Sequence, residues 1–224
     1  MCGRFTLRTP AHVLIEHFGL HGELQLPLRY NIAPTQDVVV IRQAETGREL
    51  ATMRWGLVPA WADDPKIGNR MINARSEDAA TKPSFRSAMQ RRRCLVAADG
   101  FYEWQTVGKK KQPHYIRRAD GQPFAFAGLW EAWRKVEPPL ESCTILTTAA
   151  AKSIQWLHDR MPVILSPADY DAWLNPAQQD SSKLAYLFEG FGELTTSPVN
   201  PVVNNARHDG PDCIEEIKDY EGSA

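Results

Sequence analysis

The chain has 224 residues, of which 43% are hydrophobic and 24% charged, so it is long enough to bury a sizeable core as one large domain or two small ones. No run approaches the roughly 18 apolar residues of a membrane span, and the amino terminus lacks the basic-then-apolar order of a signal peptide. We therefore expect a cytoplasmic protein with no membrane partner.

The first predicted element is a helix that begins at Thr9, a plausible N-cap followed by Pro10, and ends near Gly19. Further helices are predicted over residues 85–92, over 167–174 behind a cap at Ser166, and over 182–188. Short β-rich runs separated by Gly, Pro and Asp predict strands over residues 38–41, 50–55, 94–98, 102–105, 114–118, 124–127 and 144–148.

Two turns in this series are predicted to make hairpins. Residues 107–111 would join the strands on either side of them, and residues 119–122 would join the next pair, so that three strands lie side by side. The order mixes helices and strands without a βαβ rhythm, an internal repeat or a composition break. We expect one α+β domain with a curved, mostly antiparallel, barrel-like sheet flanked by helices.

Charge is unevenly distributed although the formal net charge is only -1. Residues 1–100 carry 14 Lys and Arg against 10 Asp and Glu, whereas residues 101–224 carry 12 against 17. Much of the negative excess lies after residue 208, and we expect a domain over residues 1–208 and an acidic, solvated and flexible tail over 209–224.

The four cysteines are widely separated and include no C-x-x-C pair, so the sequence suggests neither a zinc site nor a disulfide framework. No metal and no cofactor are expected.

Cys2 is distinctive because it follows Met1, and removal of Met1 would leave a free α-amine and a thiol on one residue. Such a 1,2-aminothiol can form a Schiff base with an aldehyde and then close to a thiazolidine. The alternative is an ordinary small residue in a frayed terminus.

Six short segments occur in order along the chain. They are Cys2-Gly3-Arg4-Phe5, Tyr30-Asn31-Ile32-Ala33-Pro34, Trp55-Gly56-Leu57-Val58-Pro59-Ala60-Trp61, Asn73-Ala74-Arg75-Ser76-Glu77, Asp99-Gly100-Phe101-Tyr102-Glu103-Trp104 and His158-Asp159-Arg160-Met161-Pro162. Together they resemble the SOS-response-associated peptidase (SRAP) family. The resemblance covers the chain from Cys2 to about Asn204. It implies a sensor that shields abasic sites in single-stranded DNA as thiazolidine crosslinks.

By this resemblance the catalytic residues are Cys2 as the nucleophile, Glu103 as the proton-shuttling carboxylate, His158 as the active-site histidine and Asn73 as an active-site amide. Taken singly, three of these have plainer readings. Glu103 could be a salt-bridged strand residue, His158 a hydrogen-bonded loop histidine and Asn73 a turn residue.

The resemblance also implies DNA-binding residues. Arg4, Arg75 and Arg160 match positions that hold the DNA backbone, and surface solvation is the alternative for each. Trp61, Asn31 and Pro34 match parts that contact or separate bases. The basic runs 91–93 and 109–111 are left as peripheral phosphate contacts or solvated faces.

The expected partner is single-stranded DNA that contains abasic sites, bound by a monomer that is nucleoid-associated when on DNA; the sequence names no protein partner. Strand cleavage by β-elimination is a conceivable side reaction. Two other readings remain open: a cysteine peptidase that removes its own Met1 or cleaves other chains, and a noncovalent single-strand binder.

Overall fold

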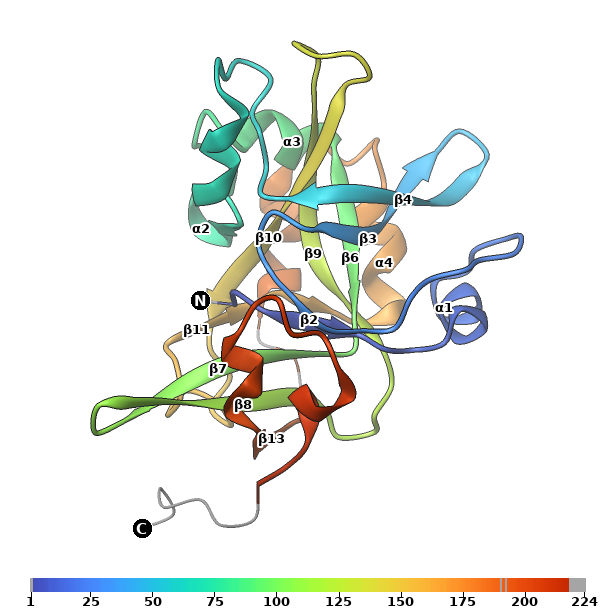
Figure 1. The fold of residues 1–224 in the computed structure, drawn as a ribbon. Helices are drawn as coiled ribbons and strands as arrows, with labels where there is room; N and C mark the ends of the chain where they lie inside the picture. The colour runs from blue at the N-terminus through green and yellow to red at the C-terminus, as the bar shows by residue number, and fades with distance from the viewer. Residues whose placement is uncertain (1, 190, 192, 218–224) are drawn as a thin grey trace.

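The computed structural model describes residues 2–189, 191 and 193–217 (Figure 1). The elements of the first half, in chain order, are β1 (Phe5–Leu7), α1 (Ala11–Phe18), β2 (Arg29–Ile32), β3 (Asp37–Ala44), β4 (Gly47–Trp55), η1 (Pro65–Arg70), β5 (Asn73–Arg75), α2 (Ser76–Ala79), α3 (Arg86–Arg91) and β6 (Arg93–Ala98). Those of the second half are β7 (Gly100–Val107), β8 (Lys110–Arg118), β9 (Phe124–Trp133), β10 (Leu140–Ala149), β11 (Arg160–Pro162), β12 (Ile164–Leu165), η2 (Pro167–Asp169), α4 (Tyr170–Leu174), η3 (Ser181–Phe188), β13 (Leu194–Pro198), η4 (Pro201–Asn204) and η5 (Pro211–Ile214).

The described residues form two sheets. One has the strand order β13-β8-β7-β1-β2, and the other has the order β11-β10-β4-β3-β6-β9-β12 with β5 paired to β10. Because β10 also pairs with β9, the strands β10, β4, β3, β6 and β9 form a closed ring of hydrogen-bonded neighbours. The expected α+β class with a curved, mostly antiparallel sheet is confirmed.

The core fills this ring and extends to the second sheet through β1. The Phe5 ring contacts the Trp55 ring at a centroid distance of 5.1 Å and the Phe126 ring at 5.6 Å, both edge to face. All three side chains have no exposed surface. Burial of such aromatic side chains contributes roughly 1.5–3 kcal/mol each. Strand β1, which follows Cys2 closely in the chain, therefore belongs to the five-stranded sheet and packs its Phe5 ring against two strands of the closed ring.

Helix α1 begins one residue later than predicted. Pro10 is its N-cap, and Gly19 closes it in the left-handed conformation with φ 61°. Thr9 does not cap the helix, because its hydroxyl and its N–H both donate to the buried carboxylate of Asp99. The Thr9 side chain, which the local sequence assigned to the helix N-cap, therefore makes a tertiary contact instead.

One of the two predicted hairpins is present. Strands β7 and β8 pair from Phe101 and Ile116 out to Val107 and Lys110 at the turn. The second hairpin is wrong, because β8 pairs with β13 in one sheet whereas β9 pairs with β6, β10 and β12 in the other. Residues 119–122 form a compact turn that carries the chain from one sheet to the other. A turn sequence determines that the chain changes direction. It does not determine which strand the next segment pairs with.

The acidic segment after residue 208 is not solvated throughout, and here the expectation of a flexible tail is corrected for residues 209–217. The Asp209 carboxylate accepts hydrogen bonds from the N–H groups of Tyr30 and Asn31 and from the Arg29 guanidinium. Cys213 is buried, and Glu216 forms a β-bridge with Val199. Negative charge in this segment is used to bind β2. Residues 218–224 lie outside the described part of the chain.

Candidate active site around Cys2

Strand β1 holds Cys2 in position through hydrogen bonds that residues 6–9 form with Asp99. Asp99 is 2% exposed, and its Oδ1 accepts from the Thr6 hydroxyl at 2.5 Å while Oδ2 accepts from the N–H groups of Arg8 and Thr9 at 2.6 and 2.7 Å. The Tyr115 hydroxyl lies 3.0 Å from the Thr6 hydroxyl. A buried carboxylate with this many donors fixes the path of the terminal strand.

Asn73 binds Cys2 directly. Its Nδ2 donates to the Cys2 carbonyl oxygen at 2.7 Å, so β5 and the amino-terminal segment are joined by a side-chain contact. The Oδ1 atom of Asn73 is buried and has no hydrogen-bond partner among the described residues. An amide with one end committed to Cys2 and an acceptor still available suits a role in holding a donor on the substrate or the Cys2 amine.

Glu103 lies in β7 and is 5% exposed. Burial raises the pKa of its carboxyl, and the positive potential of His158 partly opposes that rise. In turn, the negative charge of Glu103 adds to burial in raising the pKa of the Cys2 thiol. These two effects place Glu103 close to both Cys2 and His158.

His158 is held in a defined orientation. The N–H of Arg160 donates to Nδ1 of His158 at 2.9 Å, which leaves the proton of a neutral ring on Nε2. The carboxylate of Asp159 lies 2.8 Å from the same nitrogen and is 85% exposed, so it can pair with a protonated ring. The Arg160 N–H and the Asp159 carboxylate therefore both lie at Nδ1 and hold the ring in one orientation.

The four predicted catalytic residues converge, although they come from four separate parts of the chain. Cys2 has no exposed surface, and burial, with a smaller effect from Glu103, raises the pKa of its thiol well above the ordinary range. The thiol is consequently neutral and needs a base before it can act as a nucleophile. A carboxyl with a raised pKa and a histidine next to it can supply that proton transfer.

Two residues predicted to contact DNA, Asn31 and Arg4, form hydrogen bonds within the protein. Asn31 has no exposed surface, and its Nδ2 donates to the carbonyl oxygens of Val203, Asn205 and His208 while its Oδ1 accepts from Arg4. The Asn31 side chain therefore holds the segment after residue 202 in this structure, and its contact with a base stays a prediction. Nη1 of Arg4 is half-buried and donates to Asn31 and to the Val203 carbonyl oxygen, both at 2.9 Å.

Arg160 is also engaged within the protein. Its two terminal nitrogens donate to the Glu77 carboxylate at 2.6 and 2.8 Å, and Nη2 donates to the Thr147 carbonyl oxygen at 2.6 Å. This fork ties β11 to α2 and β10. Arg75, by contrast, is exposed two residues beyond Asn73 on β5, where alternate residues share one face. Of the three predicted arginines, Arg75 is the one best placed for a phosphate.

Pro34 is partly exposed in the turn between β2 and β3. The next residue, Thr35, is exposed with φ 73°, a left-handed conformation that costs about 1 kcal/mol or more for a residue other than glycine. The Thr35 N–H donates to the Trp55 carbonyl oxygen at 2.8 Å, which holds this turn in place. A strained, fixed turn is a suitable wedge against a base.

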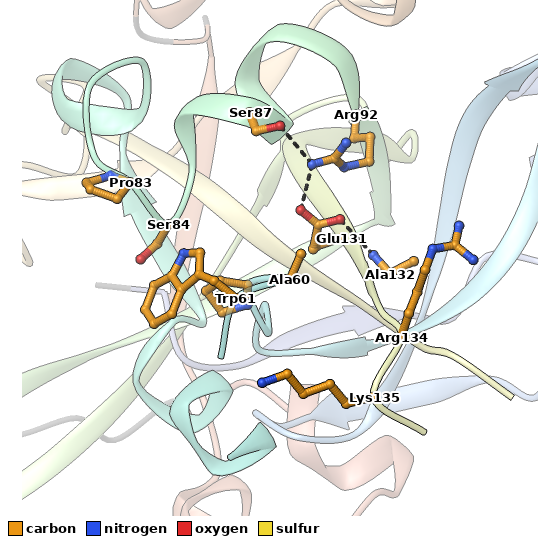
Figure 2. Close-up of a pocket in the computed structure, with 11 residues that line it drawn as sticks. Ala60, Trp61, Pro83, Ser84, Ser87, Arg92, Glu131, Ala132, Arg134 and Lys135 are labelled. Carbon is orange, nitrogen blue, oxygen red and sulfur yellow. Dashed lines mark hydrogen bonds and ion pairs between the residues drawn. The ribbon is translucent and has the colours of Figure 1, made fainter. Parts of the chain in front are cut away.

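Trp61 is 56% exposed and borders a cleft of about 540 Å³ (Figure 2). Pro83 and Ser84 lie on the same side of the cleft as its ring, and Arg134 and Lys135, which directly follow strand β9, lie opposite. An exposed indole facing basic side chains is the arrangement expected for contact with a nucleic acid.

Sequence reasoning missed two residues of this region. Asp99 belongs to one of the six family segments, yet only the fold shows that it anchors the strand behind Cys2. Trp156 is 55% exposed two residues before His158, and its ring contacts the His114 ring at 5.2 Å. No sequence signal separates an exposed tryptophan from a buried one.

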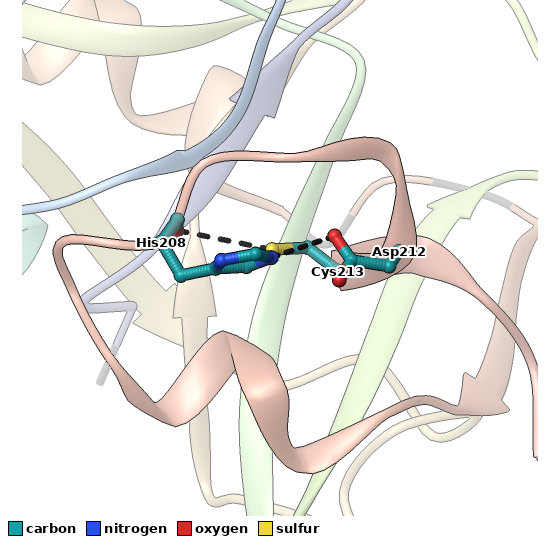
Figure 3. A group of neighbouring side chains, drawn as sticks. All are labelled: His208, Asp212 and Cys213. Carbon is teal, nitrogen blue, oxygen red and sulfur yellow. Dashed lines mark hydrogen bonds and ion pairs between the residues drawn. The ribbon is translucent and has the colours of Figure 1, made fainter.

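One cluster offers metal ligands where the sequence suggested none. Side-chain atoms of His208, Asp212 and Cys213 lie within 4.8 Å of one another (Figure 3). Nε2 of His208 lies 2.7 Å from the Asp212 carboxylate, and the Cys213 thiol faces the His208 carbonyl oxygen at 3.9 Å. These contacts close the turn that contains Asp209. Closure of this turn explains why the three side chains lie together.

Comparison with known proteins agrees with the geometry. Residues 1–206 match the model of the family described as SOS response associated peptidase (SRAP). The chain is 40% identical over 222 residues to the abasic site processing protein YoqW of Bacillus subtilis, covering 96% of this chain and 99% of that protein. It is 32% identical over 228 residues to the abasic site processing protein YedK of Escherichia coli, covering 97% and 100%.

The abasic site processing protein HMCES of Xenopus tropicalis is 34% identical over 197 residues, covering 76% of this chain and 58% of that protein. Among solved structures, a protein from Bacteroides thetaiotaomicron superposes with a TM-score of 0.86 at 23% identity, covering 96% of this chain and 100% of that chain. A protein from Bordetella bronchiseptica gives 0.75 at 27%, covering 89% and 100%. The family match over nearly the whole chain and the full-length relatives show that this protein belongs to the SRAP family.

Proposed function

We propose that this protein processes abasic sites by forming a covalent crosslink between Cys2 and the sugar aldehyde in single-stranded DNA. The observation that carries the proposal is the contact of Asn73 with the Cys2 carbonyl oxygen, together with the position of Glu103 close to both Cys2 and His158. The names of the relatives, which describe abasic site processing, support the same substrate. None of the helices in the described residues has the length and apolarity of a membrane span.

The chemistry begins when Met1 is removed and the α-amine of Cys2 becomes free. The amine adds to the aldehyde carbon of the open abasic sugar, and loss of water gives an imine. His158 is suited to assist ring opening by proton transfer, and Asn73 to orient the amine through its contact at the Cys2 carbonyl.

Ring closure follows on the same residue. The Cys2 sulfur adds to the imine carbon, its proton passes to Glu103, and a proton returns to the nitrogen, so the products are a thiazolidine and one water molecule. Because the thiol is buried and neutral, this step depends on the base. Because amine and thiol share one residue, the effective concentration of the thiol is high. Reversal uses the same groups.

We assign fewer residues to DNA binding than the sequence suggested. We assign phosphate contact to the exposed Arg75 and base contact to Trp61 and the turn at Pro34. Arg4, Asn31 and Arg160 support the walls of the site through their internal hydrogen bonds. Specificity would then come from the covalent step rather than from base readout.

The test is a denaturing-gel mobility shift with single-stranded DNA that carries one abasic site. Purified protein, with Met1 removal verified by mass spectrometry, should give a shifted band that resists denaturation. Cys2→Ala and DNA without an abasic site should give none. A band that persists in Cys2→Ala, or no band for the processed protein, would overturn the crosslinking proposal.

The peptidase reading makes a different prediction in the same samples. If Cys2 cleaves its own leader, Cys2→Ala expressed without the cellular methionine aminopeptidase should retain Met1 while wild type loses it. Equal processing of both proteins would assign Met1 removal to the host enzyme. A noncovalent strand binder would retain full DNA affinity in Cys2→Ala and show no denaturation-resistant band in wild type.

A further inference from the structure

The face of β7 and β8 that carries Glu103 continues outward beyond the candidate active site. Glu103 and His114 lie directly opposite each other in the antiparallel register, so their side chains share one face of the sheet. Gln105 lies on the same face and bonds through Oε1 with Nε2 of His114 at 3.2 Å. The path from Glu103 along this face leads to the hairpin turn.

Trp156 covers the start of this path. The turn that follows β10 brings its indole edge to face with His114, at 5.2 Å and an interplanar angle of 86°. Its Nε1 donates to the Ser153 carbonyl oxygen at 3.0 Å, which fixes the ring against its own turn. The side chain is nevertheless 55% exposed. An indole that is both held and exposed is a ready stacking surface.

Positive charge lies at both ends of this surface. Lys152 is exposed on the same turn as Trp156, and Lys109 and Lys110 are exposed at the tip of the β7–β8 hairpin. His114 and Lys110 are four residues apart on β8, which corresponds to about 13 Å along the strand. Asp159 is the acidic residue nearest in sequence to Trp156, and it pairs with His158.

We propose that Trp156 stacks an unpaired base that flanks the abasic nucleotide, and that Lys109 and Lys110 bind phosphates farther along the same strand. This rests on the proposed function, because it supplies one arm of the DNA path that ends at Cys2. Stacking on an indole is tolerant of base identity, so the arm binds a single strand without reading its sequence.

The experiment measures noncovalent affinity, so that it does not depend on crosslinking. The parent is Cys2→Ala, and the probe is fluorescein-labelled single-stranded DNA with a tetrahydrofuran abasic analogue, flanked on both sides, on the 5′ side alone or on the 3′ side alone. Adding Trp156→Ala should weaken binding by roughly 5- to 100-fold when the stacked flank is present. The effect should vanish on the probe that lacks that flank. Trp156→Phe should recover most of the affinity.

Tyr186→Ala is the matched control, because Tyr186 on η3 is exposed to a similar extent, 56%. It should bind all three probes like the parent. Replacing Lys109 and Lys110 with Gln should lower the slope of log affinity against log salt by about 0.7 for each phosphate that the variant no longer binds.

The flank dependence separates a stacking role from a structural one. Equal affinity of Trp156→Ala and the parent on every probe would overturn the proposal, and so would an equal loss on every probe. If wild type forms no crosslink while Trp156→Ala still shows the flank-dependent loss, the crosslinking function fails and the stacking arm stands. If the parent binds none of the probes, the stacking proposal fails, whereas the crosslinking function is decided by the denaturing gel of wild type.

Discussion

At the scale of single residues, the site depends on groups whose protonation differs from that in water. Burial raises the pKa of the Glu103 carboxyl, whereas a solvated carboxyl would stay ionised and could not donate a proton near neutrality. Burial also keeps the Cys2 thiol neutral, which protects it until an imine is present. The two effects make proton transfer the step on which crosslinking depends.

Glu103→Gln tests this directly. Glutamine keeps the shape but cannot exchange a proton, so the crosslinking rate should fall about 10²- to 10⁴-fold. The wild-type rate should also change at acid pH with an apparent pKa above that of a free glutamate, and the variant should lack this limb. Quenched single-turnover gels across the pH range measure both. A variant with an unchanged rate would remove Glu103 from the mechanism.

Glu77 gives a stability prediction with a defined pH range. The Arg160 fork lowers the pKa of the Glu77 carboxyl from 4.5 to about 2. A lowered folded-state pKa contributes stability above pH 4.5 that is lost as the pH falls toward 2. Glu77 is 54% exposed, so solvent screening limits the contribution to about 1 kcal/mol.

Urea unfolding of wild type and Glu77→Gln should therefore differ at pH 6 and converge near pH 2. Lys82 and Asp78 form an exposed pair on the same part of the chain, and Asp78→Asn is the matched control. A difference between wild type and Glu77→Gln that persists at pH 2 would contradict this assignment.

At the scale of elements, the short strand β1 supports the amino-terminal segment that carries Cys2. A three-residue strand has little stability of its own, and it is held by the Phe5 core contacts and by Asp99. Termini without such contacts are commonly disordered. The order of Cys2 therefore depends on interactions made by residues nearly a hundred positions away.

Asp99→Ala should consequently destabilise the fold by about 3–5 kcal/mol, because it leaves the hydroxyl of Thr6 and the N–H groups of Arg8 and Thr9 without their acceptor. Chemical denaturation measures the loss, and hydrogen exchange should show it first in β1. Asp63 forms an exposed pair with Lys135, and Asp63→Ala should leave the midpoint unchanged. Equal effects of the two substitutions would contradict the anchoring role.

At the scale of the whole molecule, the carboxy-terminal segment closes over the amino-terminal half. Asp209 binds the backbone of β2, and the carbonyl oxygens of Val203, Asn205 and His208 surround the Asn31 amide. Arg4, two residues from Cys2, donates to the same segment. Residues 203–209 and strand β2 thus pack together beside Arg4, two residues from Cys2.

Asp209→Ala should lower stability by about 1–3 kcal/mol, because β2 would be left without this acceptor. It should also increase proteolysis after residue 200, since the segment loses its attachment, and limited trypsin digestion followed by mass spectrometry measures this. Asp209→Asn, which keeps one acceptor oxygen, should have an intermediate effect. Unchanged digestion in Asp209→Ala would show that η5 and Cys213 hold the segment without it.

The sequence by itself determined the fold class, the strands that read as β-rich runs, and the family, because each depends on local composition or on ordered motifs. It also selected Cys2, Asn73, Glu103 and His158, whose roles remain predictions although the structure brings them together. Only the tertiary structure decided that residues 119–122 change sheets, that Asn31 is buried and that Asp209 binds β2. The reason is physical: a turn, an amide or a carboxylate has the same local chemistry wherever it lies, and its role depends on which distant donors and acceptors the fold brings within hydrogen-bond reach.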